Sequence, residues 1–305
     1  MSLIFKMEYF LFLVLIMSSF GLFAQSHDNL YNRSQGVNQM QYFSETVPDA
    51  FFPFGQPLKL VKQQDRTPKK VFVLGVYASA VHADWYSADG KRLCQALAVA
   101  SEPEIFWKGD NAADIIKKID IPNGAGELRV AEGRYNGPSG RTLDELYLTP
   151  LGFSRSDAWL CDLIPHSFMN TKQKNAIETN FNKICEEYGL KTASIPEEPS
   201  NITIDENRLN ELLAELEESQ AEIIILLGDY PLECFLSKVS DCKITKLRNF
   251  GKNPNDYGKV YKILIKGKQY TVLPLVHVHH SGKEGNYDQE WERLHSNWVQ
   301  SRRAH

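Results

Sequence analysis

Polar side chains that could do chemistry lie in or directly after apolar stretches at several points of the chain. His277, His279 and His280 come at the end of an apolar run near the C-terminus. Asp162 lies within another such run, and Glu102–Trp107 combines two carboxylates with two adjacent aromatic rings. Histidine donates hydrogen bonds or carries protons near neutral pH, and aromatic rings offer a stacking face. Together these residue types suit recognition of a flat polar ring by its face and its edge.

Buried strands must bring these residues together. Val71–Leu74 is a continuous apolar run, which is typical of a strand buried on both faces in a parallel sheet. Gly75 and the following residues to Ala80 continue it into a turn of small residues. Further strands are predicted over residues 158–164, 221–228, 260–265 and 270–276, with Gly267 at the turn between the last two.

Helices are predicted between these strands. Residues 92–100 carry Leu93, Ala96, Leu97 and Ala100 at the three-and-four spacing of an amphipathic helix. The alternation of strand and helix predicts an α/β fold, namely a three-layer α/β/α sandwich with a central, mainly parallel sheet. The other predicted helices cover residues 171–188, 205–220, a segment starting at Pro231, and 288–299.

The carboxyl ends of parallel strands meet at one edge of a sheet, and open parallel sheets bind ligands just beyond that edge. We therefore expect three strand ends to enclose a cleft: Gly75–Ser79, Asp162–His166 and His277–Ser281. The segment Glu102–Trp107 is expected to form a wall of this cleft.

The chain divides into three parts by composition. Residues 1–25 form an apolar leader, residues 26–47 a polar tail or linker, and residues 48–305 a single α/β/α domain. The aromatic segment 51–54 is expected to pack onto the main sheet. The leader, with its apolar stretch over residues 10–23, is too short for a comfortable transmembrane helix, so no stable membrane span is expected in the mature protein.

Two patterns disagree about the compartment. The leader resembles a secretory signal cleaved near Gln25, which favours export. The five cysteines are odd in number and lack short CxxC spacing, which argues against a disulfide framework or a zinc or iron–sulfur cluster. Reduced cysteines are typical of intracellular proteins, so we favour a cytoplasmic protein whose translation starts further on, for example at Met40. Export remains the alternative.

The overall charge bears on nucleic-acid partners. With 34 Lys and Arg against 38 Asp and Glu, the net charge is −4, so no global positive field attracts phosphate backbones. Any contact with nucleic acid must come from a local patch.

Four segments, in this order, resemble the uracil-DNA glycosylase superfamily. They are the first strand with its Gly75 turn, Glu102–Trp107, the strand end at Leu226–Gly228, and the late strand Leu273–His277. The second segment is especially similar to the mismatch-specific members, and the resemblance covers roughly residues 71–281. It implies a three-layer α/β/α fold whose first-strand motif and late histidine flank a pocket for a base extruded from DNA.

The resemblance assigns roles residue by residue. Gly75 matches the first motif, Val76 takes its variable place, and Tyr77 and Ala78 stand where the family has its water-positioning Asp or Asn and its proline. His277 matches the histidine that stabilises negative charge on the leaving base, while Val278 and His279 replace Pro and Ser. The other residues implied in substrate binding are Ser79, Trp107, Asp162 and His279. No cofactor is implied.

Tyr77 makes the water-activating group an open question. A phenol has a pKa of about 10 and is a poor general base at neutral pH. Glu102 or Glu104 is therefore predicted to substitute as the base. With His277, these two carboxylates are the predicted catalytic residues.

Two other functions compete with glycosidic cleavage of a damaged or deaminated base. The first is a binding module that keeps the base pocket without the chemistry. The second is a metal-dependent hydrolase: His277 and His279 lie on the same side of a strand, and His280, His82 or His166 would complete a zinc site. The predicted partner is DNA or a ligand that contains a nucleobase.

Overall fold

The computed structural model describes residues 45–250, 256–278 and 289–303. Thr46–His305 forms one compact unit, which begins slightly before the predicted domain start at residue 48. The leader and nearly all of the predicted tail lie outside the described residues. Within the described ranges, no helix combines the length and the apolar character that a membrane span requires.

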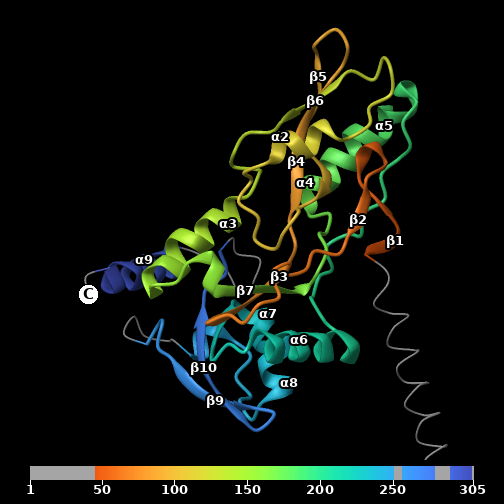
Figure 1. Ribbon diagram of the computed structural model, residues 1–305. Helices are drawn as coiled ribbons and strands as arrows, with labels where there is room; N and C mark the ends of the chain where they lie inside the picture. The colour runs from red at the N-terminus through yellow and green to blue at the C-terminus, as the bar shows by residue number, and fades with distance from the viewer. Residues whose placement is uncertain (1–44, 251–255, 279–288, 304–305) are drawn as a thin grey trace, which may run out of the picture. The chain divides into compact units, whose positions relative to one another are not determined.

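A five-stranded sheet forms the centre of this unit, and its order is β7-β3-β8-β10-β9 (Figure 1). The first four strands are parallel, and β9 pairs antiparallel with β10 at one edge. The α/β class with a mostly parallel sheet is therefore confirmed, as are the predicted strands. The bounds are β3 (Val71–Tyr77), β7 (Ala158–Ile164), β8 (Ile223–Leu227), β9 (Tyr261–Ile265) and β10 (Lys268–Leu275).

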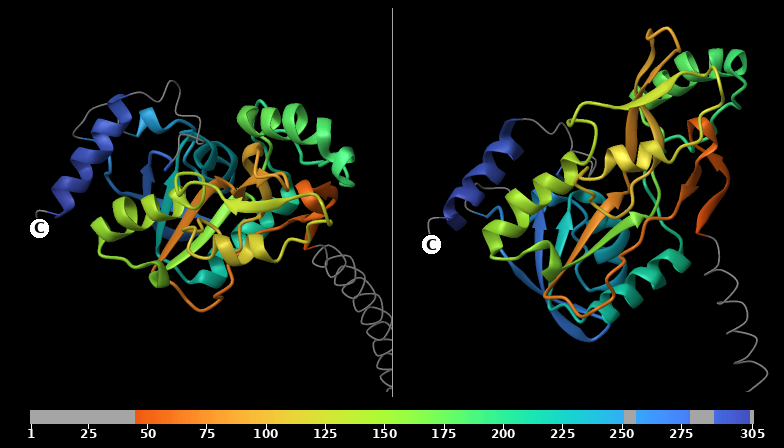
Figure 2. Two further views of the ribbon diagram at one scale, coloured as in Figure 1. Left: turned by 90° about the horizontal axis from the view of Figure 1, so that it is seen from above. Right: turned by 45° about the horizontal axis from the view of Figure 1, so that its top comes forward.

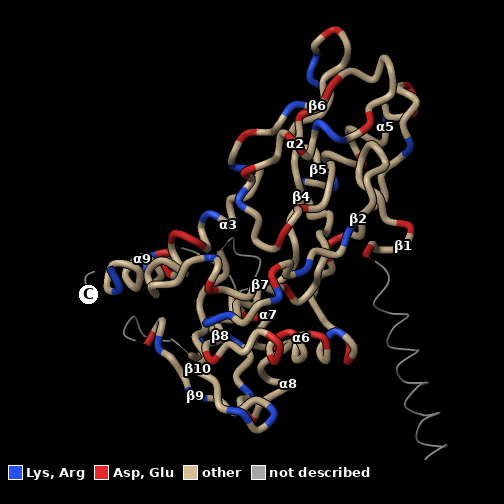
Figure 3. Tube along the Cα trace, in the orientation of Figure 1, with Lys and Arg blue, Asp and Glu red and all other residues tan. Residues whose placement is uncertain are grey.

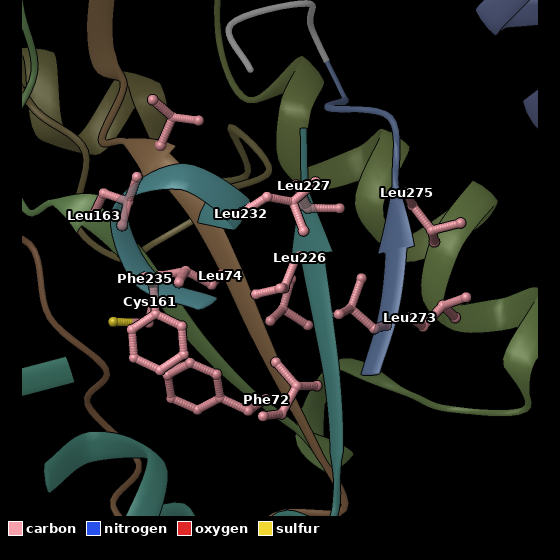
Figure 4. Packing of buried hydrophobic residues seen from close by; sticks show 14 of the residues in the cluster. Phe72, Leu74, Cys161, Leu163, Leu226, Leu227, Leu232, Phe235, Leu273 and Leu275 are labelled. Carbon is pink, nitrogen blue, oxygen red and sulfur yellow. The ribbon is translucent and has the colours of Figure 1, made fainter. Parts of the chain in front are cut away.

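Burial explains why these runs form strands. Every residue of β3 from Val71 to Val76 is buried, so both faces of this strand are shielded from water. Its side chains pack with those of β8, β10 and Phe235 of η7 (Leu232–Leu236), as Figure 4 shows. Burying a large apolar side chain contributes about 1.5–3 kcal/mol. An alternating polar pattern would have left one face in water.

The helices predicted after residue 170 are present, some of them interrupted. Asp205 caps α6 (Glu206–Ser219) by accepting a hydrogen bond from the Arg208 amide at 2.8 Å. Leu209, Leu212 and Leu216 form its buried stripe. The helix predicted over 171–188 comprises α4 (Thr171–Lys174), η5 (Asn175–Phe181), α5 (Asn182–Ile184) and η6 (Cys185–Tyr188). The remaining helical segments are α2 (Ala112–Lys117), α3 (Pro138–Leu143), η2 (Asp144–Leu148), η3 (Thr149–Leu151), η4 (Arg155–Asp157), α7 (Asp229–Pro231), α8 (Ser237–Val239), η8 (Leu247–Asn249) and α9 (Gln289–Arg303).

One predicted helix is wrong: residues 92–100 form strand β5 (Arg92–Ser101). It pairs antiparallel with β4 (Ala80–Tyr86), which also pairs with β6 (Glu127–Val130) in a second sheet of order β5-β4-β6. Three of the four residues that suggested a helical stripe, Ala96, Leu97 and Ala100, are instead part of an unbroken buried run over residues 96–100. A short apolar run fits either structure, and here the neighbouring strand β4 decides.

The second sheet lies beyond the carboxyl ends of the central strands (Figure 2) and has its own core. This core contradicts the prediction that residues 51–54 pack onto the main sheet. Phe54, in η1 (Pro53–Gly55) between β1 (Thr46–Phe51) and β2 (Pro57–Lys59), lies 5.5 Å from the rings of both Trp85 and Phe181. β4, between β3 and β7, and η5, after β7, supply these apolar partners, which the sequence near Phe54 does not reveal.

Candidate functional site

The site centres on Gly75 of β3. In the parallel register of the two strands, Gly75 lies opposite Asp162 of β7. A Cβ atom at Gly75 would lie 2.3 Å from Asp162 Oδ1 and 2.6 Å from Phe106 Cζ. A carboxyl group and an aromatic ring therefore both approach the backbone of β3, and only glycine leaves room for them.

Phe106 presents its ring to this site from a strained backbone. Its φ is +52°, a left-handed conformation that non-glycine residues seldom adopt. Arg155 supports it by donating hydrogen bonds to the carbonyls of Phe106 at 2.7 Å and Ile105 at 3.3 Å, and Asp144 pairs with this guanidinium at 3.1 Å. Strain of this kind persists where surrounding contacts over-determine it, often at functional sites.

His277 follows β10 and joins the same group of residues. Its ring centroid lies 6.5 Å from that of Phe106, at an interplanar angle of 41°. Its side chain is buried, with a relative exposure of 7%. The structure therefore brings Gly75 and Asp162 together with Phe106, and places the His277 ring near that of Phe106. The predicted cleft between these strand ends stays a prediction.

Asp162 carries a buried carboxyl group, with a relative exposure of 3%. Burial raises the pKa of Asp162 to about 7, against the opposing effect of the Arg208 guanidinium. Arg208 of α6 donates hydrogen bonds to the carbonyls of Asp162 at 2.7 Å and Leu163 at 3.0 Å. The Arg208 guanidinium thus holds the end of β7 through the backbone carbonyls of that strand.

Glu102 lies at the same sheet edge and supports the first motif. Its Oε1 accepts a hydrogen bond from the Ser79 amide at 3.0 Å. Burial raises the pKa of Glu102 well above its usual range, and the nearby charge of Asp162 adds to the rise. Glu102 therefore holds the turn after β3, and its carboxyl is buried rather than solvated.

Glu104 is not brought to this group. Its side chain is 48% exposed, and its Oε1 lies 3.9 Å from Arg155 Nη1. It lines a cavity of about 330 Å³ with Lys69 and Ala158, near the start of β3 and β7. Its predicted catalytic role therefore has no geometric support at the carboxyl edge of the sheet.

Trp107 and Phe106 point into different cores. Trp107 packs in the core of the second sheet, and its Nε1 donates to Asn111 Oδ1 at 3.0 Å. The ring beside Asp162 and His277 is that of Phe106, which was not among the residues predicted to bind substrate. The Phe-Trp pair was the only signal in the sequence, and it did not reveal which ring faces the sheet edge.

The rest of the first motif has mixed surroundings. Val76 is fully buried in the main core. The Tyr77 ring packs against Phe168 at 5.4 Å, and its hydroxyl donates to Glu198 Oε1 at 3.1 Å. Tyr77, Ala78 and Ser79 line a small recess of about 60 Å³. Asp162, Phe106 and His277 do not line this recess.

The histidines of the metal hypothesis are only partly described. His279 and His280 lie outside the described residues. In the parts of the chain that the structure describes, no three His, Cys, Asp or Glu side chains form a group that could hold a metal ion. Burial lowers the pKa of His82 to about 4, and burial also lowers the pKa of His166.

Comparison of the sequence with models of protein families gives no match, and no curated protein matches it either. The geometry of the sheet edge therefore carries the functional inference.

We expect Gly75→Ala to displace Phe106 and the Asp162 carboxyl, because the new methyl group has no room at either contact. Overpacking of this kind costs about 1–3 kcal/mol of unfolding free energy. Gly133→Ala is the matched control, since a Cβ there meets nothing within 4 Å. Chemical denaturation of both variants measures the difference, and equal stability would contradict the close approach at Gly75.

Asp162→Asn should change how stability depends on pH. The pKa of Asp162 is raised to about 7 on folding, so the wild type binds more protons folded than unfolded and loses stability as pH rises toward 7. An amide removes this titration. Relative to wild type, the variant should gain about 2–3 kcal/mol between pH 5 and pH 8.

Denaturation at several pH values measures this effect. Asp110→Asn serves as the control, because that side chain is 73% exposed and its charged form keeps its hydration. A pH-independent difference between Asp162→Asn and wild type would show that Asp162 is not held in a low-dielectric site.

Proposed function

We propose that the protein excises a damaged or deaminated base from DNA by cleaving its N-glycosidic bond, in the manner of a uracil-DNA glycosylase. One observation carries the proposal: the Phe106 ring and the Asp162 carboxyl lie against Gly75, and the His277 ring lies 6.5 Å from that of Phe106. A stacking face with two hydrogen-bonding groups suits a flat polar base taken out of the helix. The three-layer α/β/α architecture implied by the family resemblance is part of this proposal.

Each side chain has a distinct part in base recognition. Phe106 stacks on the base, and Asp162 hydrogen-bonds to its edge. A carboxyl group with a pKa near 7 offers a donor when protonated and only acceptors when ionised. Below neutral pH the protonated Asp162 therefore donates to a carbonyl on the edge of the base. Above neutral pH the ionised carboxylate accepts from an N–H group on that edge.

In the chemical step, His277 acts on the leaving base and Glu102 acts on the attacking water. The base departs with the electron pair of the C–N bond, and an N–H of His277 stabilises the negative charge. Water adds its oxygen to the sugar carbon, and Glu102 orients it as a hydrogen-bond acceptor. The proton that water loses finally resides on the departed base.

Contacts to the DNA backbone should be modest. Figure 3 shows Lys and Arg interspersed with Asp and Glu along the described chain, in keeping with the net charge of −4. Few phosphate contacts give weak binding that falls as salt rises. The activity assay is therefore best run at low salt.

The test is to incubate the purified full-length chain with oligonucleotides that carry uracil, hypoxanthine or a mismatch, both single- and double-stranded. Alkaline cleavage then reveals abasic sites. We expect His277→Ala to reduce the rate by about 10²–10³, the usual cost of removing one donor to a developing anion. His277→Gln should recover part of this loss, because it restores an N–H donor.

His166→Ala is the matched control, a histidine that follows β7 and packs against Phe168 at 4.9 Å. It should cleave like wild type. Cleavage that survives both His277→Ala and Phe106→Leu would overturn the proposal.

A binding module of the same fold is the second candidate, favoured by the Tyr77 hydroxyl and its hydrogen bond to Glu198 where a water-positioning carboxylate is expected. Base binding without cleavage would decide for it. Stoichiometric zinc that is lost in His277→Ala would instead favour the metal-dependent hydrolase.

A further inference from the structure

Two tyrosine hydroxyls hold the peptide unit next to His277. The Val276 amide donates to Tyr257 Oη at 3.1 Å, and Tyr147 Oη donates to the Val276 carbonyl at 3.0 Å. Val276 is only 1% exposed, and both tyrosines are buried. This backbone segment leads from β10 into His277, so the two hydroxyls fix the position of the backbone at His277.

His295 of α9 completes the arrangement. Its Nδ1 lies 2.8 Å from Tyr257 Oη, and its Nε2 lies 3.1 Å from the carbonyl oxygen of Leu146. A carbonyl only accepts hydrogen bonds, so Nε2 must carry a hydrogen. In the neutral ring Nδ1 is then an acceptor, and Tyr257 donates its single hydrogen to it while accepting from Val276.

The surroundings favour this neutral tautomer. His295 is 6% exposed, and its ring stacks on Tyr147 with centroids 4.1 Å apart. Burial lowers the pKa of His295 to about 4. Charged residues on the elements packed around it, Glu292, Arg293, Arg302, Glu145 and Lys259, are exposed, and Asp256 is half-buried.

We propose that His295 is a positioning residue: as the Nε2–H tautomer it orients the Tyr257 hydroxyl, which holds the Val276 amide and so places His277. The catalytic consequence rests on the proposed function, but the positioning itself does not. Helix α9 thereby becomes a support for a side chain that lies in another part of the chain.

The first test is spectroscopic and needs no activity. In the full-length chain with ¹⁵N-labelled histidine at pH 7, His295 should show a protonated Nε2 and an unprotonated Nδ1. The Nδ1–H tautomer would overturn the proposal, because the Tyr257 hydroxyl would then have no acceptor at His295.

The second test separates positioning from stability. Tyr257→Phe removes one hydroxyl and should speed amide exchange at Val276 at least tenfold and shift the imidazole signals of His277. His295→Leu should do the same, and His295→Gln should partly restore both signals because its amide offers a donor and an acceptor. Tyr261→Phe is the matched control: its hydroxyl also donates to a backbone carbonyl, that of Phe250, but it has no part in this network.

Activity measurements then separate this proposal from the proposed function. If the protein cleaves DNA, Tyr257→Phe should lower kcat about tenfold with little change in KM, and Tyr261→Phe should change neither. If no substrate is cleaved, the exchange and imidazole signals still decide the positioning role. Unchanged His277 signals in Tyr257→Phe would overturn that role even in an active enzyme.

Discussion

The close approach at Gly75 is the constraint on which the candidate site depends. The backbone ladder between β3 and β7 fixes Gly75 opposite Asp162, so the Asp162 backbone cannot move away without breaking strand pairing. Phe106 reaches the same place from a different segment, and the absence of a Cβ lets both groups lie against the strand. The ring and the carboxyl therefore have a fixed separation from β3, which a flexible loop could not guarantee. His277 follows β10, which lies on the other side of β8 from β3, and its ring lies near that of Phe106.

Burying two carboxyl groups at one sheet edge costs free energy, because each group loses its hydration. Burial raises the pKa values of both Asp162 and Glu102, so each would be cheaper to bury as an apolar side chain of similar size. Glu102 has a structural reason, because its carboxyl satisfies the Ser79 amide in the turn after β3. The Asp162 carboxyl also has a backbone partner, because it accepts a hydrogen bond from the Val76 amide, while Arg208 contacts the Asp162 backbone carbonyl. These backbone hydrogen bonds offset part of the cost of burying the two carboxyl groups.

β3, β7 and β8 were predictable because each is a continuous apolar run, which is typical of a strand buried on both faces. The edge strand β9 and its partner β10 were marked by their apolar residues on either side of the Gly267 turn. The sequence indicated neither the β5 strand nor the ring that faces the site. Residues 92–100 satisfy a helical spacing, and only the neighbouring strand β4 makes them a strand. Phe106 adopts a left-handed backbone because Arg155, far along the chain, holds its carbonyl. The β5 strand and the orientation of Phe106 both depend on interactions between distant segments, which the propensity of the local sequence does not reflect. The convergence of Gly75 and Asp162 was predictable because parallel topology alone brings strand ends together.

A common principle governs how the groups of the site are supported. Arg208 contacts the carbonyls of Asp162 and Leu163, Arg155 that of Phe106, and Tyr147 that of Val276. In each case the support binds the backbone that carries the functional side chain rather than the side chain itself. Contacts to the backbone fix where each functional side chain begins, and they come from elements far along the chain. The position of the site therefore depends on the packing of α6, η2, η4 and β10 around the sheet edge as much as on the functional residues themselves.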